Sequence, residues 1–590
     1  MPRSALTLKA LGVRLSRSWR AWRNRLRARR ARLGGPPGPV AALPGPILLG
    51  DADAGQKLVS GGWAPLGLDL RVAPASIWDI GLPEGPVGDR LEDLRQSCLW
   101  LDDLAALGSR QARLLAQGWT QDWIRHFGGG NGPGWTPERA GRRAKRWVAH
   151  SAMLTQGLDP TATDRFWRVL AMHQRYLDQA WPEAPAGLPR LRALAGLVWT
   201  GRVLPRAEQG LTLAHLGALA DELIDGEGAV ATRAPEDLAE TVTLLIWTAR
   251  LLEDGGQNAP RALLAAIARA VPVLRPLRLG DGTLARFHGG GPGAPDRLDQ
   301  ALAELRLSVQ AKPRLAMGYA RLTGGRVVVV MDGAAPPADD WALGAHAAAL
   351  GFEMSVGRQP FVVNVGPGGQ FGADWARLCR ETAAQSTVEV DGRSLARIET
   401  RDLAARVLGP RLEDGPTLVS VRQAQDATGM WLLATQDGYA ATHGLLHERR
   451  IFVEARGAEV RGEEILTVTD ARARARHDRA AADGPVGFAA RFHLHPAVRA
   501  ELDPFRQVAS LTPPSGEIWM FRVAGGALEI EDSVWFDPAL AAPVPTKQMV
   551  VRAEVVEYLG QITWSFGRVG EAPPSSARPT ATDSDPDTDL

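Results

Sequence analysis

The sequence has little cysteine, little tyrosine and no long apolar run. Its two cysteines, Cys98 and Cys379, supply neither a disulfide framework nor a zinc motif, and each is expected to be a small buried side chain. No run of about 18 apolar residues occurs, so no membrane-spanning helix is expected. With 45% hydrophobic and 23% charged residues, the chain has the composition of an ordinary soluble protein, and its 590 residues predict two or three domains.

Tryptophan, by contrast, is abundant. Nineteen tryptophans stand against four tyrosines. Indole rings are the usual stacking platform for the faces of sugars, but on helices they more often belong to the core. The composition therefore leaves both uses open, with the core favoured for most of them.

The first 34 residues carry eleven Lys or Arg and no acid, although the whole chain has a formal charge of only +2. Apolar residues recur there at spacings of three and four, which predicts a helix with one apolar and one basic side, as in helices that lie on anionic membrane surfaces. A disordered basic arm is the alternative. The apolar residues are Leu8, Leu11, Leu15, Trp19, Trp22 and Leu26.

This segment does not have the pattern of a secretory signal, because no uninterrupted apolar stretch and no small-residue cleavage site follow the basic residues. We therefore expect a cytoplasmic or inner-membrane-associated protein, with the periplasm or cell envelope as the alternative. Residues 1–60 are predicted to comprise this basic segment and a Gly/Pro-rich linker. Residues 569–590 are predicted to be a disordered acidic tail.

Residues 61–311 are predicted to form a helical domain. Pro137, Pro235 and Pro260 each stand where a first helical turn tolerates a missing N–H. Successive helices joined by short loops make antiparallel pairs, which is how a toroid is assembled. Helical periodicity predicts the helices Leu91–Leu107, Pro137–Leu154, Asp164–Trp181, Leu188–Val203, Ala207–Ile224, Pro235–Glu253 and Pro260–Leu274.

Residues 312–568 are predicted to form an antiparallel β domain with many strands. From about Arg314 onward, runs of Val, Leu and Phe alternate with Gly, Asp and Pro turns. The predicted strands include Val327–Met331, Pro360–Val365, Thr387–Val390, Thr417–Val421, Leu446–Glu454, Glu517–Val523 and Ile562–Phe566.

A set of short phrases in the chain resembles the heparinase II/III family of polysaccharide lyases. In that family a histidine opens a strand of the type H-A-x-x-L-x-F-E-L, a second strand ends near V-D/N-x-G, and a T-x-A-H-[SN]-T strand follows. Here these pieces are His346–Met354, Val362–Gly366 and Thr382–Thr387. Further family-like phrases bring the resemblance to roughly residues 60–568; they include Trp135-Thr-Pro-Glu, Gly280–Phe287, Asp437-Gly-Tyr, Gly444–His447, Phe492–Pro496 and Glu531–Val534.

The resemblance implies an α/α toroid followed by an antiparallel β-sandwich and, for the best-known members, β-elimination of uronic-acid polysaccharides. That reaction needs a neutraliser for the carboxylate, a base for the C5 proton and an acid for the leaving oxygen. In the resembling enzymes an Asn-His pair, a tyrosine after a D-G turn and a histidine of the β domain supply these roles. The matching positions here hold Leu188, Pro189, Asp237 and Gly344.

Some members of the family also hold a zinc ion with side chains from three strands. The matching positions here hold His346, Asn364 and Gln385. One imidazole and two neutral amides are a poor ligand set for zinc. We therefore expect a hydrogen-bonded cluster joining three strands at this degraded site, and no metal or other cofactor.

The remaining polar candidates lie on segments that the family folds toward its cleft. Arg233 and Arg286 are the expected carboxylate clamps, since arginine donors form a rigid fork. His288 lies in a glycine-rich loop with room for a ligand, and its ordinary pKa suits a general base; a loop histidine with no proton-transfer role is the favoured alternative. Asp237 and His346 are the expected substrate-binding residues.

Two functions follow from these expectations. The first is a divergent polysaccharide lyase with a relocated base, acting on a uronic-acid-containing glycan. The second is a non-catalytic glycan-binding or envelope-assembly protein that keeps the cleft. The expected partners are an acidic polysaccharide and, through residues 1–34, an anionic membrane surface; no nucleic acid is expected.

Overall fold

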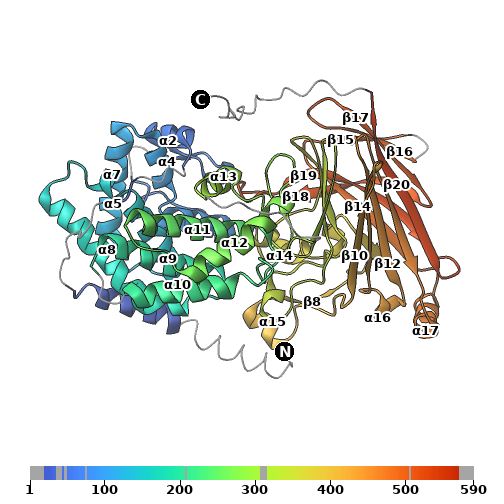
Figure 1. The fold of residues 1–590 in the computed structure, drawn as a ribbon, viewed down its shortest axis with the longest axis horizontal. Coiled ribbons are helices and arrows are strands. Elements are labelled where there is room, and N and C mark those ends of the chain that lie inside the picture. Colours follow the sequence, from blue (N-terminus) through green and yellow to red (C-terminus); the bar gives the residue numbers. More distant parts are fainter. Residues whose placement is uncertain are drawn as a thin grey trace, which may run out of the picture.

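The computed structural model describes residues 19–34, 43–45, 50–72, 76–205, 209–305, 315–503 and 507–570. A helical part is followed along the chain by a β part, on the left and right of Figure 1. The N-terminal half of the predicted amphipathic helix and nearly all of the predicted acidic tail lie outside the described residues. The predicted domain boundary at residues 311/312 also lies outside them.

The helical part is an α/α toroid in which α6, α9, α11 and α13 contact one another in succession, while α8, α10 and α12 pack against them (Figure 1). One small hairpin, β1 (Gly62–Trp63) with β2 (Leu70–Arg71), precedes α3. The helices are α2 (Ala52–Val59), α3 (Pro86–Gln96), α4 (Trp100–Leu107), α5 (Arg110–Phe127), α6 (Pro137–Ala149), α7 (Ser151–Thr155), α8 (Pro160–Ala180), α9 (Leu188–Val203), α10 (Gln209–Leu223), α11 (Pro235–Asp254), α12 (Arg261–Leu274) and α13 (Pro295–Ala303).

The helix starts follow N-terminal capping chemistry. Thr136 caps α6 and Asp159 caps α8, each by accepting a hydrogen bond from a backbone N–H of the first turn, and a proline follows each cap. The predicted helix Leu188–Val203 is confirmed at both ends as α9. The single predicted helix Leu91–Leu107 is wrong, because Cys98 adopts a φ of 56° and divides the stretch into α3 and α4.

Most of the tryptophans belong to the core. Trp123, Trp135 and Trp147 pack around His173, and the buried Arg143 guanidinium lies 4.0 Å from the Trp123 ring. The exposed tryptophans of the described chain are Trp19, Trp22 and Trp431. Sugar stacking by most of the indoles is therefore excluded by their burial.

The β part is a sandwich of two large antiparallel sheets, with a separate two-stranded sheet formed by β8 (Arg397–Glu399) and β9 (Arg411–Glu413). One large sheet has the strand order β18-β19-β14-β6-β5-β4-β3, with β7 also pairing with β14, and the other has the order β10-β11-β12-β13-β20-β17-β16-β15. The strands are β3 (Tyr319–Gly324), β4 (Val327–Asp332), β5 (Phe352–Val356), β6 (Gln359–Val363), β7 (Val388–Val390), β10 (Val419–Gln425), β11 (Gly429–Gln436), β12 (Leu446–Glu454), β13 (Glu459–Thr467), β14 (Gly487–Leu494), β15 (Arg499–Leu502), β16 (Val508–Thr512), β17 (Ile518–Ala524), β18 (Ala527–Trp535), β19 (Val544–Glu554) and β20 (Leu559–Val569).

The strand predictions fail mainly at strand ends. The predicted strand Leu446–Glu454 is confirmed as β12. The prediction Thr417–Val421 is displaced, since β10 begins at Val419. Thr417 is instead bonded to a side chain, its N–H donating to Asp437 Oδ1 over 2.8 Å, and so stands outside the β10–β11 ladder.

The two parts meet through the first sheet. Arg321 of β3 donates to the carbonyl of Pro276 over 3.0 Å, and Arg90 of α3 donates to the carbonyl of Leu540 over 3.1 Å. The second sheet faces away from the helices (Figure 1). No helix in the described part of the chain is long and apolar enough to cross a bilayer.

Candidate functional site

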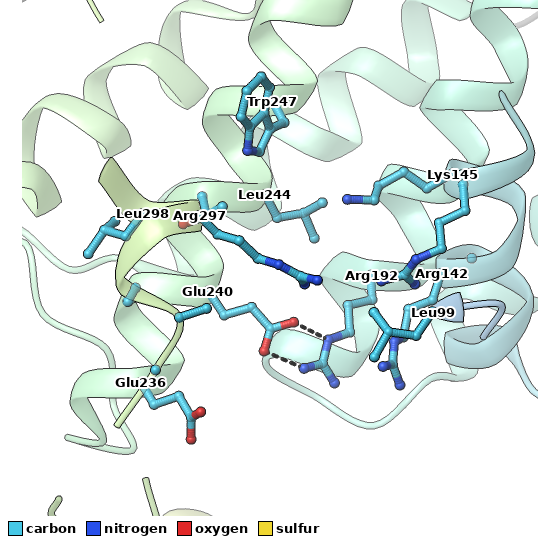
Figure 2. Close-up of a pocket in the computed structure, with 16 residues that line it drawn as sticks. Leu99, Arg142, Lys145, Arg192, Glu236, Glu240, Leu244, Trp247, Arg297 and Leu298 are labelled. Atoms are coloured by element: carbon cyan, nitrogen blue, oxygen red, sulfur yellow. Dashed lines mark hydrogen bonds and ion pairs between the residues drawn. The ribbon is translucent and has the colours of Figure 1, made fainter. Parts of the chain in front are cut away.

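A basic pocket of about 300 Å³ lies between α6, α9, α11 and α13 of the toroid (Figure 2). Gly141 on α6 and Gly196 on α9 let these two helices approach closely, because a Cβ on Gly196 would lie only 2.4 Å from the Cα of Gly141. The charged residues of the lining are Arg142, Lys145, Arg146, Arg192, Arg297, Glu236 and Glu240. Five cations against two carboxyls suit an anionic ligand.

Ion pairs fix most of these cations. Arg192 donates to Glu240 through two bonds of 2.9 and 2.5 Å and also pairs with Glu138. Although burial alone would raise it, Arg192 holds the pKa of Glu240 below its ordinary value. The wall is therefore ordered before any ligand enters.

Lys145 differs from its neighbours. No ion pair within the described ranges involves it, and its ammonium lies 5.5 Å from the Trp199 ring. In Figure 2 the Lys145 side chain extends into the pocket. Burial, with a further contribution from Arg146, lowers the pKa of Lys145 to about 8. An incoming anion can therefore pair with Lys145 without displacing a carboxylate.

A second pocket, of about 460 Å³, shares Arg192 with the first. Leu188 and Pro189 open α9 here, Asp237 lies in the first turn of α11, and Trp341 is contributed by the β part. Burial raises the pKa of Asp237, which also bonds to the Thr232 side chain. The positions at which the resemblance implies an Asn-His pair and a tyrosine thus line one pocket, where they provide two aliphatic side chains and the carboxyl of Asp237; Glu222 is the other carboxyl of the lining.

His288 does not lie in either of these pockets. Its side chain is fully buried, with Nε2 lying 3.2 Å from Asp332 Oδ2 and Nδ1 accepting from the backbone N–H of His346 over 3.1 Å. Burial lowers the pKa of His288, against the opposing effect of Asp332. The expectation of a glycine-rich loop with room for a ligand is wrong, because the loop packs against the β part; the catalytic role of His288 remains a prediction.

Arg233 belongs to the same buried cluster. It pairs with Asp332 and donates to the carbonyls of Met317 and Ala335 over 3.2 and 2.8 Å. Although burial alone would raise it, Arg233 and His288 hold the pKa of Asp332 below its ordinary value. We call Arg233, His288 and Asp332 the interface cluster, since it ties the α11 end of the toroid to β4.

Arg286 and Asn364 lie close to the interface cluster and are also buried. The Arg286 guanidinium lies over the Trp535 ring at 4.9 Å, and its backbone N–H donates to Glu353 over 3.0 Å. Burial raises the pKa of Glu353 to about 7. The Asn364 amide bonds to the backbone of Arg286 and, over 2.9 Å, to that of Ser386.

The degraded zinc site is a different arrangement from the one expected. His346 lies in the loop before β5 rather than on a strand, and its Nδ1 is 3.4 Å from Gln385 Nε2, while Gln385 also donates to the carbonyl of Cys379 over 2.7 Å. The expected cluster of three side chains is therefore a His346–Gln385 pair with Asn364 bonded elsewhere. No group of three or more His, Cys, Asp or Glu in the described part of the chain could hold a metal.

Of the five predicted residues, the structure brings four together at the domain interface and places Asp237 alone in a pocket. Sequence reasoning missed Asp332 and the cations of the basic pocket. The signal for the pocket was present, because Arg142, Lys145 and Arg146 recur at the i, i+3 and i+4 positions that share one face of a helix. Asp332, at the end of an apolar strand, carried no comparable signal.

The structure is a helical toroid, with pockets between its helices, joined to a two-sheet β-sandwich. Residues 309–565 match the family described as "Heparinase II/III-like, C-terminal". The chain is 32% identical over 530 residues to FtsZ-localized protein C of Caulobacter vibrioides, covering 88% of each chain. The protein belongs to the heparinase II/III family.

Solved structures show the same fold at low sequence identity. A crystal structure of heparinase III aligns with a TM-score of 0.67 at 11% identity, covering 92% of this chain and 89% of that one. A heparan sulfate lyase of Pedobacter heparinus aligns with a TM-score of 0.52 at 12% identity, covering 88% and 83%. These likenesses establish the architecture and not the reaction.

Proposed function

We propose that this protein is a non-catalytic member of the heparinase II/III family that binds an acidic glycan in its basic pocket and works with FtsZ at the cytoplasmic face of a bacterial membrane. The observation that carries the loss of catalysis is the second pocket, where Leu188 and Pro189 form an aliphatic wall. Neither side chain can neutralise a carboxylate or transfer a proton. The lyase fold then serves to bind and position.

The histidines support the same conclusion. A general base must come within hydrogen-bond reach of the proton that it removes. The His288 side chain has no exposed surface and both of its nitrogens face protein groups. His346 is also buried, and burial holds its pKa well below the ordinary value.

One observation favours retained catalysis. Asp237 lies in the second pocket next to Arg192, and burial raises its pKa. A carboxylate in this position could act as a relocated base, with Arg192 neutralising the carboxylate of a uronic acid. The second candidate function is therefore β-elimination by Asp237.

A lyase assay separates these candidates. Purified protein incubated with a panel of uronic-acid polymers should give no rise in absorbance near 235 nm, the mark of new unsaturated sugar ends, while retaining an acidic polymer in a binding assay. A heparan sulfate lyase serves as the positive control. Product formation that is lost in Asp237→Asn would establish the second candidate instead.

The membrane part of the proposal rests on the helix formed by residues 19–31. Arg23 and Arg27 pair with Glu183, and Ala28 and Ala31 are buried, so one side of the helix docks on the toroid. Two indoles face solvent, with Trp19 57% and Trp22 55% exposed. Exposed indoles on a basic helix suit the headgroup region of an anionic bilayer.

Vesicle sedimentation tests the membrane contact. Trp19→Ser/Trp22→Ser should release the protein from anionic vesicles without disturbing the docked side of the helix, and high salt should weaken binding of the unaltered chain. Trp431→Ser, which removes an exposed indole from the β-sandwich, is the matched control and should bind as the unaltered chain does. Equal binding by all three proteins would contradict the proposal.

The association with FtsZ is supported by the relative from Caulobacter vibrioides, which is described as FtsZ-localized and aligns over most of both chains. A fluorescent fusion in a bacterial host should coincide with FtsZ at midcell and disperse when FtsZ is depleted. A fusion that stays at midcell without FtsZ would overturn this part of the proposal.

A further inference from the structure

A groove of about 810 Å³ is lined by residues of the second sheet. Figure 1 shows this sheet on the side of the β part away from the toroid. The floor of the groove is aromatic: the Trp431 ring on β11 lies 4.2 Å from the Phe452 ring on β12, and Trp431 is 44% exposed. Cross-strand partners in the register are Trp431 and Phe452, so both rings stand on one face.

Four arginines line this groove, each from a different strand. Arg422 is on β10, Arg450 on β12, Arg461 on β13 and Arg522 on β17. With strands about 4.8 Å apart, the five steps from β10 to β17 span roughly 24 Å. The cations therefore form a row across the strands and over the aromatic floor.

The two ends of the row lack ion-pair partners. Arg450 pairs with Glu448 and Glu463, and Arg461 pairs weakly with Glu459 at 3.4 Å. Neither Arg422 nor Arg522 takes part in an ion pair within the ranges that the structure describes. The positive charges of the groove therefore suit an elongated anion that reaches from Arg422 at one end to Arg522 at the other.

The chain itself carries such an anion beyond β20. Asp583, Asp585, Asp587 and Asp589 occupy every second position. In an extended segment these four carboxylates share one side and stand about 7 Å apart, which matches a row of cations rather than a single site.

The connecting chain is long enough. β20 ends at Val569, and its groove-lining residues Ser565 and Thr563 lie about 14 and 20 Å back along the strand at the usual rise per residue. Residues 571–582 can span up to about 40 Å. The segment 583–589 can therefore reach the groove of its own chain.

We propose that residues 583–589 bind in the groove of their own chain, with the aspartates on the arginine row and the backbone over Trp431 and Phe452. An acidic peptide added in solution must then compete with this segment for the groove. This docking is independent of the toroid pockets and of the membrane contact.

Peptide binding tests whether residues 583–589 occupy the groove. A fluorescently labelled peptide of residues 571–590 is titrated, by anisotropy, with the full chain and with the chain ending at Gly570. Because a tethered segment has a millimolar effective concentration, the full chain should bind the peptide at least about tenfold more weakly than the shortened chain. Peptide binding to the shortened chain should weaken with added salt.

Two variants of the shortened chain and one variant of the peptide locate the site. Arg422→Gln/Arg522→Gln should weaken peptide binding about tenfold, and a peptide with the four aspartates changed to asparagine should not bind. Arg499→Gln, an exposed position on β15 of the same sheet, is the matched control and should change nothing. Equal binding by the full and shortened chains, or no binding to the shortened chain, would overturn the proposal, as would binding that survives the double change.

Discussion

The basic pocket and the interface cluster both combine cationic side chains with carboxylates, but only the pocket leaves a cation available to a ligand. In the pocket, Lys145 keeps a cation without a carboxylate partner beside an open volume. In the interface cluster, Arg233 and His288 pair with Asp332, and Arg233 also donates to backbone carbonyls. These side chains therefore already have protein partners where a ligand would have to bind. The comparison teaches that accessibility and existing partners, rather than residue type, separate a binding group from a structural one.

The largest expected effect comes from breaking the interface cluster. Asp332→Ala leaves the buried Arg233 charge and the His288 proton uncompensated, which should cost about 3–5 kcal/mol of unfolding free energy. The measurement is the shift of the denaturation midpoint in urea. Asp532→Ala, which removes an exposed pair with Lys547, is the control and should leave the midpoint unchanged. A folded Asp332→Ala protein of unaltered stability would break the comparison.

The pocket should show the reverse behaviour. Lys145→Gln removes a cation but no ion pair, so affinity for an acidic oligosaccharide should fall about tenfold while the denaturation midpoint stays nearly constant. Isothermal titration and urea unfolding of the same preparation give both values. Lys145→Arg retains the charge and should retain most of the affinity. A loss of stability as large as that of Asp332→Ala would show that Lys145 is structural too.

The architecture was predictable from sequence because it depends on periodicity. An apolar helical run with a proline in its first turn predicted α9 to the residue, and a short run ending in Ile, Phe and Val between turn residues did the same for β12. Cys98 was not predictable in this way, because a positive φ at a non-glycine residue is imposed by tertiary packing. The sequence therefore predicts one continuous helix where the structure has α3 and α4.

The site was less predictable, since it depends on which way side chains turn. Arg233 and Asp237 are four residues apart, yet one joins β4 and the other lines a pocket. The glycine-rich segment around His288 has the composition of an accessible loop. His288 is buried because that loop packs against the β part. The lack of catalytic groups was easier to predict. Leu188 and Pro189 can neither neutralise a carboxylate nor transfer a proton, whichever way their side chains point.

The pocket also predicts a pH dependence. The pKa of Lys145 is lowered from 10.5 to about 8, so its ammonium is charged below pH 8 and neutral above it. Affinity for an acidic oligosaccharide should therefore fall as the pH rises from 7 to 9, by no more than the loss caused by Lys145→Gln. Lys145→Arg stays charged over this range and should give a flat profile. The same decline in Lys145→Arg would assign the titration to another group.

The smallest expected effect concerns zinc at His346, a buried residue that contacts His288 of the interface cluster. Zinc prefers anionic or imidazole donors, whereas the partners available to His346 are the amides of Gln385 and Asn364, each already bonded to protein groups. Protein purified and dialysed without chelator should carry well under one equivalent of zinc by elemental analysis. Chelation should leave the melting temperature unchanged, because a ligand that does not bind the folded state cannot stabilise it. Stoichiometric zinc that is lost in His346→Ala would contradict this, and would mean that the buried side chains around His346 rearrange to accept a ligand.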